Sequence, residues 1–104
     1  MAFSGKPYFQ IPRPIRRKGF LNVETLAGTK TLVAKDSQFQ ALDPNGSNRD
    51  VLLPPELDGL RYDILHDGGA NNLVISNDAG GNIVTLTTGQ SATVVCDGSV
   101  WKKF

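Results

Sequence analysis

The sequence predicts an all-β fold, a single small antiparallel β-sandwich or barrel of about eight or nine short strands with an extended N-terminal arm. The chain has 104 residues, which is the length of one domain. Its apolar runs are short, rich in Val, Ile, Leu and Thr, and separated by Gly, Asn and Asp clusters. Since no window has the period of an amphipathic helix, strands are expected throughout the domain.

The expected strands follow one another between turn signals. The run at residues 60–66 alternates well, with Leu60, Tyr62 and Ile64 on one face. The runs at 72–76 and 82–86 flank a Gly-rich turn and predict a hairpin. In the turn at 43–46, Asp43 is expected to cap the backbone and Gly46 to adopt a positive φ. The complete set of expected strands is 20–26, 29–34, 38–42, 50–53, 60–66, 72–76, 82–86, 91–96 and 99–103.

Residues 1–19 predict an extended basic arm, followed by an all-β domain at 20–104. Pro7, Pro12 and Pro14 exclude a helix there and favour extended backbone. The arm mixes apolar and cationic side chains, as a segment that is buried against a partner subunit would. The alternatives are a frayed tail and a first strand packed on its own domain. The candidate contact residues are Phe3, Tyr8, Phe9, Ile11, Arg13, Ile15, Arg16, Arg17 and Lys18.

The net charge of +1 conceals an asymmetry along the chain. Residues 1–35 carry a net charge of +6 and residues 36–104 a net charge of −5. The basic cluster at 13–18 would suit phosphate groups, but the acidic body would repel a polyanion. We therefore expect an acidic protein surface as the partner of the arm, and neither nucleic acid nor a membrane.

No residue pattern predicts catalysis, a cofactor or a metal. His66 is the single histidine, and Ser91 lacks the second glycine of a nucleophile elbow. We interpret His66 as a partly exposed histidine at a strand end. Cys96 is also single and lies in an apolar run, which is typical of a small core residue. One Cys and one His cannot form a structural zinc site, so the chain is not expected to be an enzyme.

A series of short motifs follows one another from residue 29 to 101. They are TLVAKDS (31–37), ALDPNG (41–46), VLLPP (51–55), GLRYDI (59–64), GANNLVI (69–75), GGNIVTL (80–86), GQSATVV (89–95) and DGSVW (97–101). Their order resembles a family of small all-β modules in the virion structural proteins of tailed bacteriophages. The final pattern of strand, Asp-Gly and Trp101 is the most recognisable part. The single module and basic arm make the chain most similar to the capsid decoration (cement) proteins.

The resemblance implies a protein without chemistry of its own, made in the host cytoplasm and located on the outer capsid surface of the virion. It implies a homotrimer that bridges and stabilises major capsid subunits. The alternative is a tail- or fibre-associated adhesin module that binds a host glycan or receptor. Such a module should expose aromatic side chains, whereas Tyr62 and Trp101 lie within expected strands.

Overall fold

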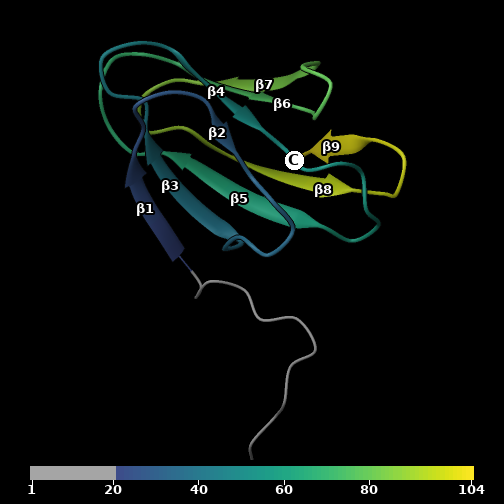
Figure 1. Cartoon of the computed structure of the whole chain (residues 1–104). Helices are drawn as coiled ribbons and strands as arrows, with labels where there is room; N and C mark the ends of the chain where they lie inside the picture. The colour runs from purple at the N-terminus through teal and green to yellow at the C-terminus, as the bar shows by residue number, and fades with distance from the viewer. Residues whose placement is uncertain (1–20) are drawn as a thin grey trace, which may run out of the picture.

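The computed structural model describes residues 21–104, which contain nine strands and no helix (Figure 1). The strands occupy nearly all the expected positions. The largest difference is the second strand, which has two residues instead of six. The strands are β1 (Leu21–Thr25), β2 (Lys30–Thr31), β3 (Phe39–Asp43), β4 (Arg49–Leu52), β5 (Arg61–His66), β6 (Leu73–Ser76), β7 (Asn82–Leu86), β8 (Ser91–Cys96) and β9 (Trp101–Lys103).

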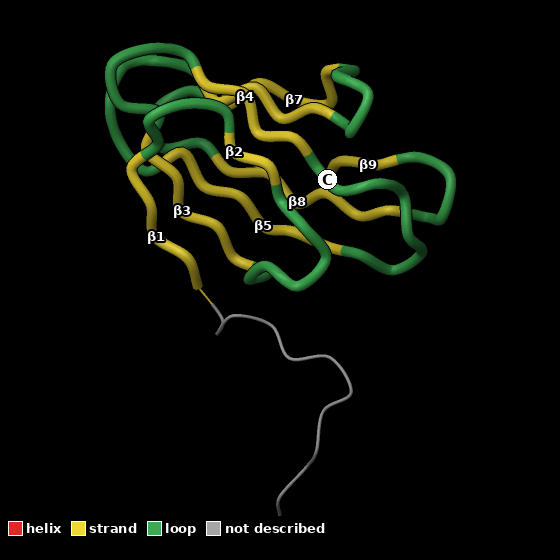
Figure 2. Tube along the Cα trace, viewed as in Figure 1, coloured by secondary structure: helices red, strands yellow, loops and turns green. Residues whose placement is uncertain are grey.

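The strands form two sheets between which the chain repeatedly crosses (Figure 2). One sheet has the order β1-β3-β5-β8-β9 and the other the order β2-β4-β6-β7. The first six strands alternate between the sheets, so each odd-even pair forms one turn of a flattened coil. After β6 the chain turns back on itself and adds β7, β8 and β9 as antiparallel strands.

The expectation of purely antiparallel sheets is wrong. Four of the seven strand pairings are parallel, namely β1–β3, β3–β5, β2–β4 and β4–β6. Successive strands of one sheet run in the same direction because the chain returns through the other sheet. The predicted hairpin of β6 and β7 is confirmed. The sheets do not close into a barrel, since β1 and β9 remain the outer strands of the larger sheet.

The core lies between the sheets and draws side chains from both. Leu42 and Ile64 come from the larger sheet, and Val51 and Ile75 from the smaller one. Near β9, the Trp101 ring packs on Tyr62 with ring centroids 6.1 Å apart, and its Nε1 donates to the Pro54 carbonyl oxygen at 3.2 Å. Both aromatic side chains are buried, as their places within strands suggested. Other core members include Leu26, Leu32, Leu53, Leu73, Leu86, Ala92, Val94 and Cys96.

The structure also tests three local expectations. Asp43 Oδ1 accepts a hydrogen bond from the Asn45 amide at 2.9 Å, and Gly46 has φ +86°, so the predicted turn is confirmed. Cys96 is buried, as expected. His66, however, is fully buried rather than partly exposed. Its ring Nε2 hydrogen-bonds the Asn71 carbonyl oxygen, because the loop after β5 folds over the strand end.

Replacing Trp101 with Ala should lower the free energy of unfolding by about 3–5 kcal/mol, because it removes a buried ring and opens a cavity. Urea unfolding followed by circular dichroism measures the change. Phe104→Ala is the control, since Phe104 is 80% exposed and should cost less than ~0.5 kcal/mol. Equal losses in the two variants would contradict this account of the core.

Candidate protein-docking surface

The nine contact residues that the sequence suggested lie outside the described residues 21–104. They are Phe3, Tyr8, Phe9, Ile11, Arg13, Ile15, Arg16, Arg17 and Lys18. The structure instead describes the surface of the domain at the point where this arm joins β1. That surface has an unusual distribution of polar and apolar side chains.

Strand β1 carries its apolar side chains on the solvent side. Leu21 is 58% exposed and Val23 is 65% exposed, whereas the alternate residues Asn22 and Glu24 are half-buried. A strand on the surface of a folded domain normally has the opposite arrangement, with apolar side chains in the core. The face that β1 presents to solvent is therefore suited to being covered by another molecule or segment.

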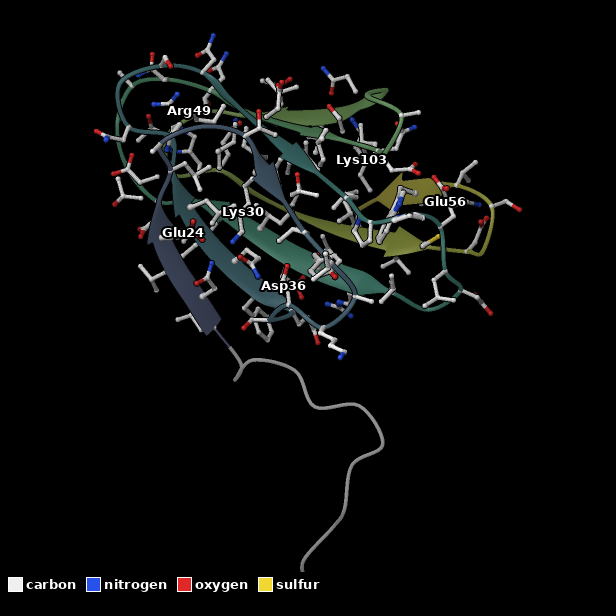
Figure 3. The ribbon with its side chains drawn as sticks, viewed as in Figure 1. Glu24, Lys30, Asp36, Arg49, Glu56 and Lys103 are labelled. Atoms are coloured by element: carbon white, nitrogen blue, oxygen red, sulfur yellow. The ribbon has the colours of Figure 1, made fainter. Side chains whose placement is uncertain are left out.

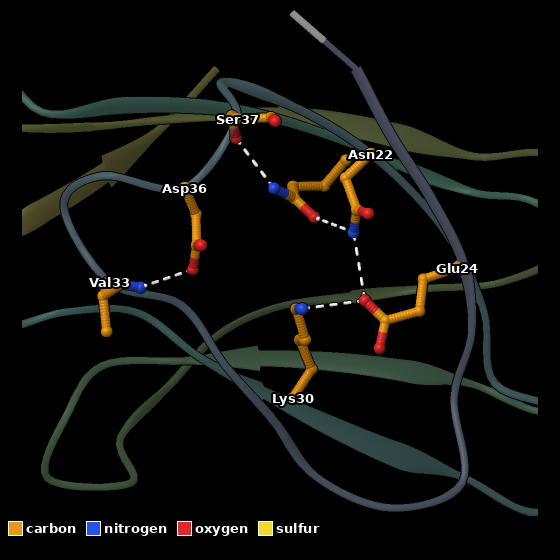
Figure 4. A network of polar contacts seen from close by, with 7 residues as sticks. Asn22, Glu24, Lys30, Val33, Asp36 and Ser37 are labelled. Atoms are coloured by element: carbon orange, nitrogen blue, oxygen red, sulfur yellow. Dashed lines mark hydrogen bonds and ion pairs between the residues drawn. The ribbon is translucent and has the colours of Figure 1, made fainter. Parts of the chain in front are cut away.

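A polar network accounts for the inward orientation of Asn22 and Glu24 (Figure 4). Glu24 Oε1 accepts from Lys30 Nζ at 2.7 Å and from Asn22 Nδ2 at 3.0 Å. Asn22 Nδ2 also donates to Gln40 Oε1 at 2.8 Å, and Gln40 Nε2 donates to the Ser37 carbonyl oxygen at 2.8 Å. Figure 3 shows Glu24 and Lys30 on the side of the molecule where β1 and β2 lie.

The electrostatics of this network favour the charged form of Glu24. The hydrogen bond from Lys30 is the largest influence, and together with the one from Asn22 it holds the pKa of Glu24 below its ordinary value despite partial burial. A one-residue shift of β1 would place Leu21 and Val23 inward but would break these bonds. The network thus keeps Leu21 and Val23 on the solvent side of β1.

The apolar side chains of β1 continue across β3 and β5. The register aligns Leu21 with Phe39 and Val23 with Ala41 and Leu65. Phe39 is 43% exposed and Leu65 is 38% exposed. A shallow depression of about 300 Å³ lies on this side of the sheet, lined by Leu21, Phe39, Ala41, Leu65 and neighbouring residues. We call these five residues, Leu21, Val23, Phe39, Ala41 and Leu65, the apolar face.

Asp63 borders the apolar face and is held by three side chains. Its carboxylate accepts from Thr93 Oγ1 at 2.5 Å, from Gln38 Nε2 at 2.9 Å and from Arg61 at 3.3 Å. Burial raises the pKa of Asp63, but these three hydrogen bonds outweigh it and the net pKa is below the ordinary value. Asp63 and Arg61 thus form an ion pair beside the apolar depression, and this border is polar without a net charge.

The sequence did not reveal this face. The alternation of Leu21 to Thr25 is visible in the sequence, but alternation alone does not say which side of a strand is buried. The informative signal is that Asn22 and Glu24 find polar partners in Gln40 and Lys30, which lie on β3 and β2.

Within residues 21–104 there is no helix of the length and apolarity needed to span a membrane.

Replacing Asp63 with Asn should lower the free energy of unfolding by about 1 kcal/mol at pH 7, because charge-assisted hydrogen bonds become neutral ones. The folded-state pKa is lowered, so the stabilisation is complete above the unfolded pKa of about 3.9 and is lost as the pH falls through the folded value. Urea unfolding between pH 7 and pH 2.5 should show the two proteins converging at the acid end. Asp50→Asn, at an exposed position of β4, is the control, and a constant difference across this range would refute the assignment.

Comparison with known proteins adds no further constraint on this surface. No protein-family model matches the chain, and no curated protein matches it.

Proposed function

We propose that this chain is a capsid decoration protein of a tailed bacteriophage. It binds the outer surface of the assembled head and stabilises the head by bridging major capsid subunits. The observation that carries the proposal is the outward apolar side of β1, where Leu21 and Val23 are more than half exposed. A domain that functions as a building block of an assembly needs such a surface, because association removes it from water. The motif order from residue 29 to 101 supports the same function.

In this proposal the arm supplies the contacts with the shell. The apolar residues Phe3, Tyr8, Phe9, Ile11 and Ile15 are anchors, and Arg13, Arg16, Arg17 and Lys18 approach acidic capsid surface. Since exposed ion pairs are individually weak, the cations act mainly on the rate of docking. The protein acts as a homotrimer on the outer capsid surface, and its two sheets are the layers of a sandwich.

The second candidate is a tail- or fibre-associated module that binds a glycan or receptor. Sugar rings pack on exposed aromatic side chains, and the structure buries both Tyr62 and Trp101. The apolar face is mainly aliphatic, with Phe39 as its single ring. These features favour a protein partner over a glycan.

Deleting residues 1–18 should leave a folded domain, since the nine strands lie beyond this segment. The truncated protein should lose most of its binding to the shell, because each buried apolar anchor is worth about 1.5–3 kcal/mol before ordering costs. Co-sedimentation with purified capsids measures binding, and circular dichroism verifies the fold. Unchanged affinity of the truncated protein would contradict the proposed role of the arm.

Replacing Arg13, Arg16, Arg17 and Lys18 together with Gln should slow association with capsids at low salt. The difference from the wild type should shrink near ~0.5 M salt, where screening is strong, while dissociation changes less. Surface plasmon resonance on immobilised capsids measures both rates. If the wild type binds DNA at physiological salt and the substitutions abolish only that binding, the cluster serves nucleic acid instead.

A further inference from the structure

We infer that the apolar face of one subunit receives the N-terminal arm of a neighbouring copy, so that exchanged arms hold the oligomer together. The inference deepens the proposed function and rests on it for one point, that the protein is a homotrimer. It assigns an occupant to Leu21, Val23, Phe39, Ala41 and Leu65. It refines the role of the arm: the apolar segment at 8–11 lies on the next subunit and supports binding to the shell by holding the trimer together, while the basic cluster at 13–18 contacts the shell directly.

The apolar face has no cover within residues 21–104. β1, β3 and β5 are mutually parallel, and the other sheet covers only their inner face, because the chain returns through that sheet. The inner face of this part packs on the core, with Leu42 and Ile64 buried there. On the outer face, Leu21 and Val23 remain more than half exposed. This apolar surface is therefore available to a segment outside residues 21–104.

The arm and the domain have opposite net charges. Residues 21–104 carry a net charge of −4 and residues 1–20 a net charge of +5. Asp63 lies beside the apolar face but is paired with Arg61 at 3.3 Å, so it does not by itself select a cation. The complementarity is between the acidic domain as a whole and a segment that is both apolar and basic. Residues 1–20 have this composition, with Phe3, Tyr8, Phe9, Ile11 and Ile15 among five cations.

The length of the arm and the position of its cations favour a neighbouring subunit over the arm's own chain. The apolar face spans about 7 Å along β1, from Leu21 to Val23. An arm that folded back onto its own face would lay Arg16, Arg17 and Lys18 over it first, since these residues are nearest in the chain. The apolar segment at 8–11 is ten or more residues from β1, a reach of about 33 Å when extended. The domain at residues 21–104 has an expected radius of gyration of about 12 Å and hence a diameter of about 31 Å, so this segment can reach the next subunit.

The test is disulfide trapping between two variants that each carry one new cysteine. Tagged Phe9→Cys and untagged Phe39→Cys are co-expressed, and Cys96 stays in place because it is buried. Thr85→Cys replaces Phe39→Cys as the matched control, since Thr85 is exposed on β7 of the other sheet. The double variant Phe9→Cys with Phe39→Cys reports an arm that folds back on its own chain. Purified protein without capsids is oxidised and separated by non-reducing electrophoresis, and light scattering gives the mass.

The expected result is a disulfide between tagged and untagged chains, at a yield about tenfold above that of the Thr85→Cys control, because docking raises the local concentration of the two thiols. The wild type should have three times the chain mass of 11.2 kDa, and Val23→Lys, at a 65% exposed position, should reduce that mass. An intrachain disulfide in the double variant, or a yield equal to that of the control, would overturn the inference. Trapped chains that fail to bind capsids would contradict only the proposed decoration function, so the two failures are distinguishable.

Discussion

The contact of Glu24 with Lys30 and Asn22 determines which side of β1 faces solvent. Lys30 is on β2, so the 2.7 Å ion pair joins the first strand of one sheet to the first strand of the other. Asn22 extends this link to Gln40 on β3. With these polar groups turned inward, the period of two in a strand leaves Leu21 and Val23 outward. The outward position of Leu21 and Val23 therefore follows from the inward hydrogen bonds of Asn22 and Glu24. These bonds lie at the open end of the core, beside β1 and β2.

The coil topology explains why this open end exists. Each turn of the coil pairs with the turn that follows it, and within residues 21–104 no strand precedes β1 or β2 to cover the first turn. At the other end, β8 and β9 extend the larger sheet, and Trp101 and Tyr62 fill the space between the sheets. Stacked repeats commonly need a terminal unit that differs from the others, because an end turn lacks one neighbour. Here the two strands of the first turn direct polar side chains inward, namely Asn22, Glu24 and Lys30.

The sequence predicted strand positions well because they depend on local signals. Turn residues such as Asp43 and Gly46 and the alternation around Tyr62 determine where strands begin and end. Strand pairing depends on contacts between distant residues, so the parallel arrangement was missed. His66 was expected to be partly exposed because its position at a strand end says nothing of the loop that covers it. The apolar face was missed for the same reason, since Asn22 and Glu24 acquire their inward orientation from Gln40 and Lys30.

The two outer strands of the larger sheet, β1 and β9, differ in the features that discourage pairing with another chain. β9 has three residues and carries Lys102 and Lys103, both features that discourage pairing with another chain. β1 has five residues, contains neither Lys nor Pro, and turns its acidic residue Glu24 toward the core. The inward charge of Glu24 also discourages edge pairing, but β1 has no charge on its solvent side. The same sheet thus has a short, lysine-bearing edge at β9 and, at β1, an edge strand that follows the basic arm directly and whose solvent side is apolar.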